Sequence, residues 1–154
     1  MTITFLVVSY ILLIAFILFM PKKITIQEMY ITFIVVALHT LVADTLFAGI
    51  FKLYVVMGEP GPQLIDLFTE LTLPALFGII YINFIPNGLK KKLGYIIIWV
   101  VLSVLYEILS RYVGYITFKG WENWLSVLFY LYACTFMIFH QSFIRKLKRD
   151  RRHH

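Results

Sequence analysis

The sequence predicts an all-α fold, an integral membrane bundle of five transmembrane helices. Apolar residues make up 61% of the 154 residues and charged residues only 14%, against roughly 45–50% and about 25% in soluble globular domains. A chain of this length cannot bury so much apolar surface in its own core, because a small domain has too much surface for its volume. We therefore expect five long apolar stretches to face a lipid bilayer.

The first stretch, about residues 2–20, contains no charged side chain and is long enough to cross a hydrocarbon layer of about 30 Å. A cleavable signal peptide has basic residues before its apolar stretch and a small-x-small cleavage site after it. This stretch lacks both features and is followed by Pro21, Lys22 and Lys23. We expect an uncleaved spanning helix. The alternative is a four-helix bundle, with the first segment lying apart or at the interface.

Four further helices are expected at about residues 29–54, 63–85, 93–118 and 121–143, in one transmembrane domain that ends in a basic tail at residues 145–154. The connections at residues 58–62 and 86–88 are rich in proline and glycine, which interrupt helices. Pro74 lies within the third helix and predicts either a kink beside Glu70 or ordinary packing.

Basic residues mark one side of the expected bundle. Eleven of the fourteen lysines and arginines lie in alternate connections or in the tail, and the other three are Lys52, Arg111 and Lys119. The positive-inside rule then places the N-terminus outside and the C-terminus in the cytoplasm. Charges that flank apolar stretches do not form a nucleic-acid-binding face, so we expect no nucleic acid partner. The expected membrane-surface anchors are Lys22, Lys23, Lys90, Lys91, Lys92, Arg145, Lys146, Lys148 and Arg149.

Charged side chains also occur inside the apolar stretches, where such groups normally face a bundle interior or a wet cavity. At a rise of about 1.5 Å per residue, their distances outward from the middle of each segment are about 2 Å for Glu107, 4 Å for Asp44, 6 Å for Glu70, 8 Å for Arg111 and 12 Å for Asp66. Asp66 and Glu70 are four residues apart and share a helix face, as do Glu107 and Arg111. We expect these five residues, with His39, to form an outward-facing polar cluster.

The charges of this expected cluster do not balance. Four carboxylates against Arg111 leave a formal charge of −3, which Lys52 and Lys119 reduce to −1 if they reach inward. Carboxylates without compensation in a low-dielectric region take up a proton or attract a cation. We therefore expect at least one of Asp44, Glu70 and Glu107 to bind a proton, a cation or a small polar ligand, for transport or sensing. Arg111 is the expected counter-ion and His39 the expected relay; no metal is specified and no cofactor is expected.

The same residues also fit a structural role. Glu107 with Arg111, and Asp44 or Glu70 with His39 or a lysine, would join helices through charge-assisted hydrogen bonds. The protein would then be a structural or accessory membrane subunit. We expect no enzymatic activity, because the sequence has no G-x-x-x-x-G-K, G-x-S-x-G or H-E-x-x-H motif. A short five-helix chain needs a second copy of itself or another membrane protein to form a conducting path, so such a partner is expected.

Several short motifs are spread along the chain: Pro21-Lys22-Lys23, Asp44, Asn83-x-x-Pro86, Tyr95, Trp99, Tyr106-Glu107 and Trp121-x-x-Trp124-x-Ser126. In these positions the chain resembles a family of small, uncharacterised multi-spanning membrane proteins of Bacillus- and Clostridium-like bacteria. The resemblance covers most of the chain. It implies a bacterial cytoplasmic membrane and implies no catalytic residue or ligand.

Overall fold

The computed structural model describes residues 1–57 and 64–150, without the side chains of residues 149 and 150. Its elements are the helices α1 (Thr2–Phe19), α2 (Ile26–Asp44), α3 (Leu64–Asn83), α4 (Leu89–Tyr112) and α5 (Asn123–Asp150), the π-helix η1 (Thr45–Ile50), and the strands β1 (Tyr54–Val56) and β2 (Ile116–Phe118). The five α-helices confirm the predicted helical bundle. The turn expected at residues 58–62, the last residues of the tail from 151 on, and the side chain of the predicted anchor Arg149 lie outside the described residues.

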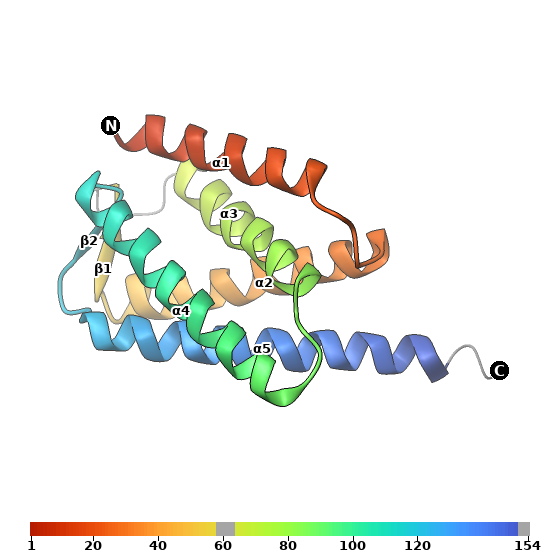
Figure 1. Cartoon of the computed structure of the whole chain (residues 1–154). Helices are drawn as coiled ribbons and strands as arrows, with labels where there is room; N and C mark the ends of the chain where they lie inside the picture. The colour runs from red at the N-terminus through yellow and green to blue at the C-terminus, as the bar shows by residue number, and fades with distance from the viewer. Residues whose placement is uncertain (58–63, 151–154) are drawn as a thin grey trace.

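The helices run back and forth between two ends of the molecule (Figure 1). Both strands lie at the end where α1 begins, where α4 ends and where α5 begins. At the opposite end, the Asn83 side chain accepts a hydrogen bond from the Lys23 N–H (2.8 Å) and donates one to the Pro21 carbonyl (3.0 Å). We call the first the strand end and the second the basic end, because Lys22 and Lys23 of the α1–α2 connection and the three lysines at the start of α4 lie there.

Helix α3 occupies the centre of the bundle and contacts α1, α2 and α5. Ten of its twenty residues are buried, among them Leu73, Ile79 and Ile82. The outer helices expose large apolar side chains instead; Leu12 on α1 and Ile97 on α4 are each 64% exposed. Apolar surface on this scale is typical of contact with a membrane or a partner. All five helices are long and apolar enough to cross a bilayer, which supports the prediction of a multi-pass membrane protein.

Helix α4 ends at Tyr112, not at about residue 118 as the sequence predicted. Gly114 has a φ of +80°, a conformation that glycine adopts without the steric cost of a side chain. Its N–H donates to the Arg111 carbonyl (3.0 Å), and the Tyr115 N–H donates to the Ser110 carbonyl (2.8 Å), which together form a Schellman motif. Helix α4 also begins at Leu89 instead of at about residue 93. Its middle therefore lies nearer the basic end, and Glu107 is about 10 Å from that middle instead of about 2 Å.

Helix α2 also differs from the prediction, because it continues as η1 to Ile50 and stops before residue 54. Within η1 the hydrogen bonds span five residues, and at its end the Phe51 N–H donates to the Leu46 carbonyl (2.9 Å). Lys52 has a φ of +53° and ends the helical path before β1. Short π-helical turns are frequent at functional sites, and this one begins directly after Asp44.

The strands β1 and β2 pair in an antiparallel two-stranded sheet, with Tyr54 opposite Phe118. The Leu53 carbonyl, directly before β1, accepts hydrogen bonds from the three N–H groups of residues 119–121 at 2.8–3.0 Å. The sheet therefore ties the α2–α3 connection to the α4–α5 connection. Neither strand was predicted, because both runs are apolar and lie at the ends of the helices expected at residues 29–54 and 93–118.

Two further helix boundaries lie beyond their predicted positions. Helix α2 begins at Ile26, where Thr25 and Glu28 form a capping box: the Glu28 N–H donates to the Thr25 hydroxyl (3.3 Å) and the Thr25 N–H to the Glu28 carboxylate (2.6 Å). Helix α5 continues to Asp150 rather than ending near residue 143. The basic run that begins at Arg145 therefore extends the last helix beyond its apolar part.

Candidate functional site

Three carboxylates gather at the strand end of α2 and α3, and we call them the acidic cluster. Asp44 is the last residue of α2, and Asp66 and Glu70 lie one turn apart on α3. Glu70 interacts electrostatically with both Asp44 and Asp66, so the three groups repel one another when all are ionised. Asp66 is buried, with 4% of its surface exposed, and Asp44 and Glu70 are partly buried. The structure thus brings together three of the six residues that the sequence singled out.

Two tyrosines outside the helices face the acidic cluster. Tyr54 of β1 donates a hydrogen bond to the Asp44 carboxylate. Burial, and after it the negative charge of Asp44, raises the pKa of Tyr54 above its usual value near 10. Burial and the charges of Glu70, Asp66 and Asp44 raise the pKa of Tyr115 in the same direction. Both phenols therefore stay protonated at neutral pH and supply hydroxyl groups beside the carboxylates.

The basic residues of the strand end do not neutralise the acidic cluster. Lys52 and Lys119 are exposed, so they do not reach inward to reduce the negative charge of the carboxylates. Arg111 lies over the Phe118 ring, with 4.4 Å from its guanidinium carbon to the ring centroid. The charged groups that act on Glu70 are the carboxylates of Asp44 and Asp66. Glu70 therefore repels Asp44 and Asp66 when these groups are ionised.

Glu107 belongs to a different set of contacts, between α4 and α5. Glu107 is 7% exposed, and its carboxyl group accepts hydrogen bonds from the Ser126 hydroxyl (2.7 Å) and the Tyr130 hydroxyl (2.9 Å). The Trp121 Nε1–H donates in turn to the Ser126 hydroxyl (2.7 Å). The predicted pairing of Glu107 with Arg111 is therefore wrong in this structure. Their spacing permits a pair, but Glu107 binds donors from α5, while Arg111 stacks on Phe118.

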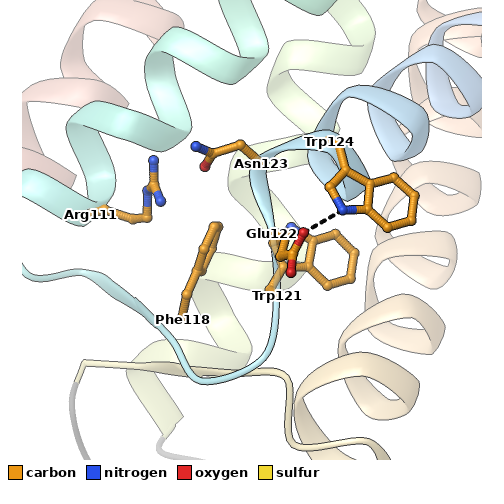
Figure 2. A pocket seen from close by; sticks show the side chains of 6 residues that line it. All are labelled: Arg111, Phe118, Trp121, Glu122, Asn123 and Trp124. Atoms are coloured by element: carbon orange, nitrogen blue, oxygen red, sulfur yellow. Dashed lines mark hydrogen bonds between the residues drawn. The ribbon is translucent and has the colours of Figure 1, made fainter.

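Arg111 lines a shallow, open depression at the strand end together with Phe118, Trp121, Glu122, Asn123 and Trp124. Figure 2 shows Arg111 on the α4 side, Glu122 and Trp124 on the α5 side, and the Phe118 ring between them. The Trp124 Nε1–H donates a hydrogen bond to the Glu122 carboxylate (2.6 Å). None of the three carboxylates of the acidic cluster lines this depression.

His39 lies against α5 and does not join the acidic cluster. Its ring stacks on Phe136, with 5.0 Å between the centroids, and lies 5.4 Å from the ring of Tyr132. The side-chain partner of Asp44 is Tyr54 rather than His39. The relay from His39 that the sequence suggested is therefore not assembled here.

The described residues contain no group of three or more His, Cys, Asp or Glu side chains arranged to hold a metal ion. The acidic cluster instead offers carboxylate and phenol oxygens. Oxygen ligands suit protons and hard cations, and such cations often take backbone carbonyls or water as further ligands. Proton uptake and the binding of a small cation are the chemistry that this arrangement supports.

No family model, curated protein or solved structure matches this chain significantly. The resemblance to the bacterial membrane family stays a prediction. The assignment of function therefore rests on the geometry of the acidic cluster and of the contacts around it.

Sequence reasoning missed four side chains that define these sites: Tyr54, Tyr115, Ser126 and Tyr130. Ser126 and Tyr130 are four residues apart on one face of α5, a spacing that indicates a shared interface without naming Glu107 as the partner. Of the two other tyrosines, Tyr54 is the first residue of β1 and Tyr115 directly precedes β2. Gly114 is a helix-ending signal in the sequence, and a helix that ends before it leaves Tyr115 outside.

Proposed function

We propose that this chain is a multi-pass protein of a bacterial cytoplasmic membrane, with its N-terminus outside and its C-terminus in the cytoplasm. The separation of the two ends supports this orientation, since the lysines of two connections and the basic extension of α5 lie at the basic end. The positive-inside rule assigns that end to the cytoplasm. The strand end, with the acidic cluster, then faces the outside. The bacterial location rests on the family resemblance.

The acidic cluster, in this proposal, binds a proton or a small cation from the outside, in transport or sensing. One observation carries the proposal: Glu70 interacts electrostatically with two further carboxyl groups, those of Asp44 and Asp66. Mutually repelling carboxylates in a low-dielectric region take up protons or bind a cation. The phenols of Tyr54 and Tyr115 add neutral oxygen atoms to the same place. A conducting path requires a second copy of the chain or another membrane protein.

Thermal unfolding of the purified protein in detergent, across pH and across Na⁺, K⁺, Mg²⁺ and Ca²⁺, tests this proposal. A ligand present at about 100 times its dissociation constant adds about 2.7 kcal/mol to the free energy of unfolding, which is a measurable rise in the midpoint. We expect acid or one cation to raise the midpoint of the wild type and to lose this effect in Glu70→Gln. Glu28→Gln is the matched control, because it makes the same change at the basic end and glutamine also serves in a capping box.

A wild-type midpoint that responds to neither acid nor any of the four cations contradicts the proposal. A response that persists unchanged in Glu70→Gln contradicts it as well. These outcomes favour the second candidate, a structural or accessory subunit whose buried polar groups specify helix packing or a partner. The contacts of Glu107 support that candidate, since both of its oxygens accept hydrogen bonds from α5.

A further inference from the structure

The depression beside Arg111 contains a cationic donor without an acceptor. The Nε atom of Arg111 is buried, and no described residue accepts a hydrogen bond from it. The guanidinium carbon lies 4.4 Å from the centroid of the Phe118 ring, which holds the group in place from one side. A planar guanidinium favours carboxylate and phosphate groups, which accept two parallel hydrogen bonds. Arg111 lines the depression, so the guanidinium nitrogens beyond the buried Nε are suited to an anionic group that enters from outside the chain.

The opposite wall of the depression carries the reverse charge. Glu122 is exposed, and its carboxylate accepts only one hydrogen bond from the described residues, that of Trp124. A carboxylate has about four acceptor positions, so most of them remain available to a ligand. Figure 2 places the Phe118 ring between Arg111 and Glu122. The depression therefore presents a positive and a negative group across an apolar floor.

We propose that this depression binds a zwitterion with a phosphate group on Arg111 and a primary ammonium group on Glu122, as in the headgroup of phosphatidylethanolamine. A simple anion fits less well, because Glu122 repels it. A quaternary ammonium group binds best over aromatic faces, and Arg111 already occupies one face of Phe118. A primary ammonium group can also donate hydrogen bonds to Glu122, which a quaternary one cannot.

The surroundings of the depression favour a lipid as the source of this headgroup. Trp124 is 57% exposed and Tyr112, at the end of α4, is 82% exposed. Tryptophan and tyrosine concentrate at the level of lipid headgroups in membrane proteins. A lipid in the outer leaflet can thus reach Arg111 with its phosphate while its acyl chains stay in the bilayer. This inference rests on the proposed orientation in the membrane but not on the acidic cluster.

Native mass spectrometry of the full chain in detergent tests the proposal with phosphatidylethanolamine, phosphatidylglycerol and phosphatidylcholine of equal acyl chains. We expect the wild type to bind phosphatidylethanolamine about tenfold more tightly than the other two, a difference of about 1.4 kcal/mol. Arg111→Gln should bind all three about tenfold more weakly. Glu122→Gln should lose the preference for phosphatidylethanolamine. Lys119→Gln is the matched control, because it removes a positive charge at the same end outside the depression and should behave as the wild type.

Equal binding of the three lipids by the wild type overturns the proposal, and so does unchanged phosphatidylethanolamine binding in Arg111→Gln. If Arg111→Gln does not fold, the same lipid binding is measured with Arg111→Lys. Lysine keeps the charge without the planar fork, so intermediate binding supports the proposal and wild-type binding overturns it. Free O-phosphoethanolamine separates the two sources: displacement of the lipid supports the same chemistry with a soluble zwitterion, and no displacement supports the lipid headgroup. Glu70→Gln should leave lipid binding unchanged, which separates this inference from the function of the acidic cluster.

Discussion

The hydrogen bond from Tyr130 to Glu107 provides a direct test of how α4 is joined to α5. The Tyr130 hydroxyl donates to Glu107 at 2.9 Å, and the other carboxyl oxygen of Glu107 accepts from Ser126 at 2.7 Å. Tyr130→Phe removes one hydroxyl and leaves the ring in place. Its effect on the free energy of unfolding therefore reports the hydrogen bond rather than the packing of the ring.

We expect Tyr130→Phe to lower the free energy of unfolding by about 1–1.7 kcal/mol. Hydrogen bonds to charged groups contribute about 1.5–3 kcal/mol in soluble proteins. Double-mutant cycles in a membrane helical protein give a lower scale, about 0.6 kcal/mol on average and about 1.7 at most, because polar groups unfolded in the membrane also find partners. The lower scale applies to this protein. We expect a loss of unfolding free energy near the upper end of this scale, because the acceptor belongs to Glu107, a residue that is only 7% exposed.

A double-mutant cycle of Tyr130→Phe with Glu107→Leu measures this contact by reversible unfolding in mixed SDS micelles, followed by circular dichroism. In the Glu107→Leu background, Tyr130→Phe should cost nothing or stabilise, because the hydroxyl has lost its acceptor. The matched control is Tyr132→Phe, the same change on the same helix in a side chain that is 51% exposed. A coupling energy below about 0.3 kcal/mol, the usual limit of additivity, refutes the structural role. Glu107 would then return to the candidate ligand groups.

Two further changes test the packing and the strand end. Gly78→Ala places a Cβ 2.9 Å from Val36 Cγ2, whereas a Cβ at Gly94 meets nothing within 4 Å. Overpacking costs about 1–3 kcal/mol, whereas replacing glycine by alanine within a helix gains about 0.5–1 kcal/mol. Gly78→Ala should therefore lower the thermal midpoint, and Gly94→Ala should not. Equal midpoints of the two variants would contradict the close packing of Gly78 against Val36. Burial raises the pKa of Tyr54. The contribution of its protonated phenol to the free energy of unfolding is therefore complete below about pH 10 and declines as pH rises above that value. Tyr54→Phe should therefore reduce the alkaline loss of unfolding free energy above about pH 10, and an unchanged loss contradicts the burial of this phenol.

The sequence predicts the five helices and the end at which the acids lie, because both follow from one-dimensional properties. Apolar length identifies a spanning helix, and counting residues from its middle gives depth. The exact helix ends depend on local motifs that apolar length does not record. Thr25 and Glu28 extend α2 toward the basic end through a capping box, and Gly114 shortens α4 through its positive φ. Both motifs are visible in the sequence, but apolar length alone does not record them.

The lateral arrangement of the helices is the part that the sequence does not encode in a readable form. Spacing of four residues correctly places Asp66 and Glu70 on one face of α3. The same rule fails for Glu107 and Arg111, because it describes one helix and ignores competing partners. The hydroxyl groups of α5 occupy Glu107, and the ring of Phe118, which follows the unpredicted turn after α4, holds Arg111.

Glu70 and Glu107 show how the partners of a carboxyl group determine its role. Glu107 meets two hydroxyl donors, and these contacts satisfy it whether or not a ligand is present, so its removal should affect stability first. Glu70 meets two other carboxylates, and no rearrangement of those neighbours removes the repulsion while all three stay ionised. Only a bound proton or cation removes it, so the substitution of Glu70 should change the response to ligand first. The two glutamates therefore separate the binding function from the structural one in the same protein, with stability and ligand response as the two measurements.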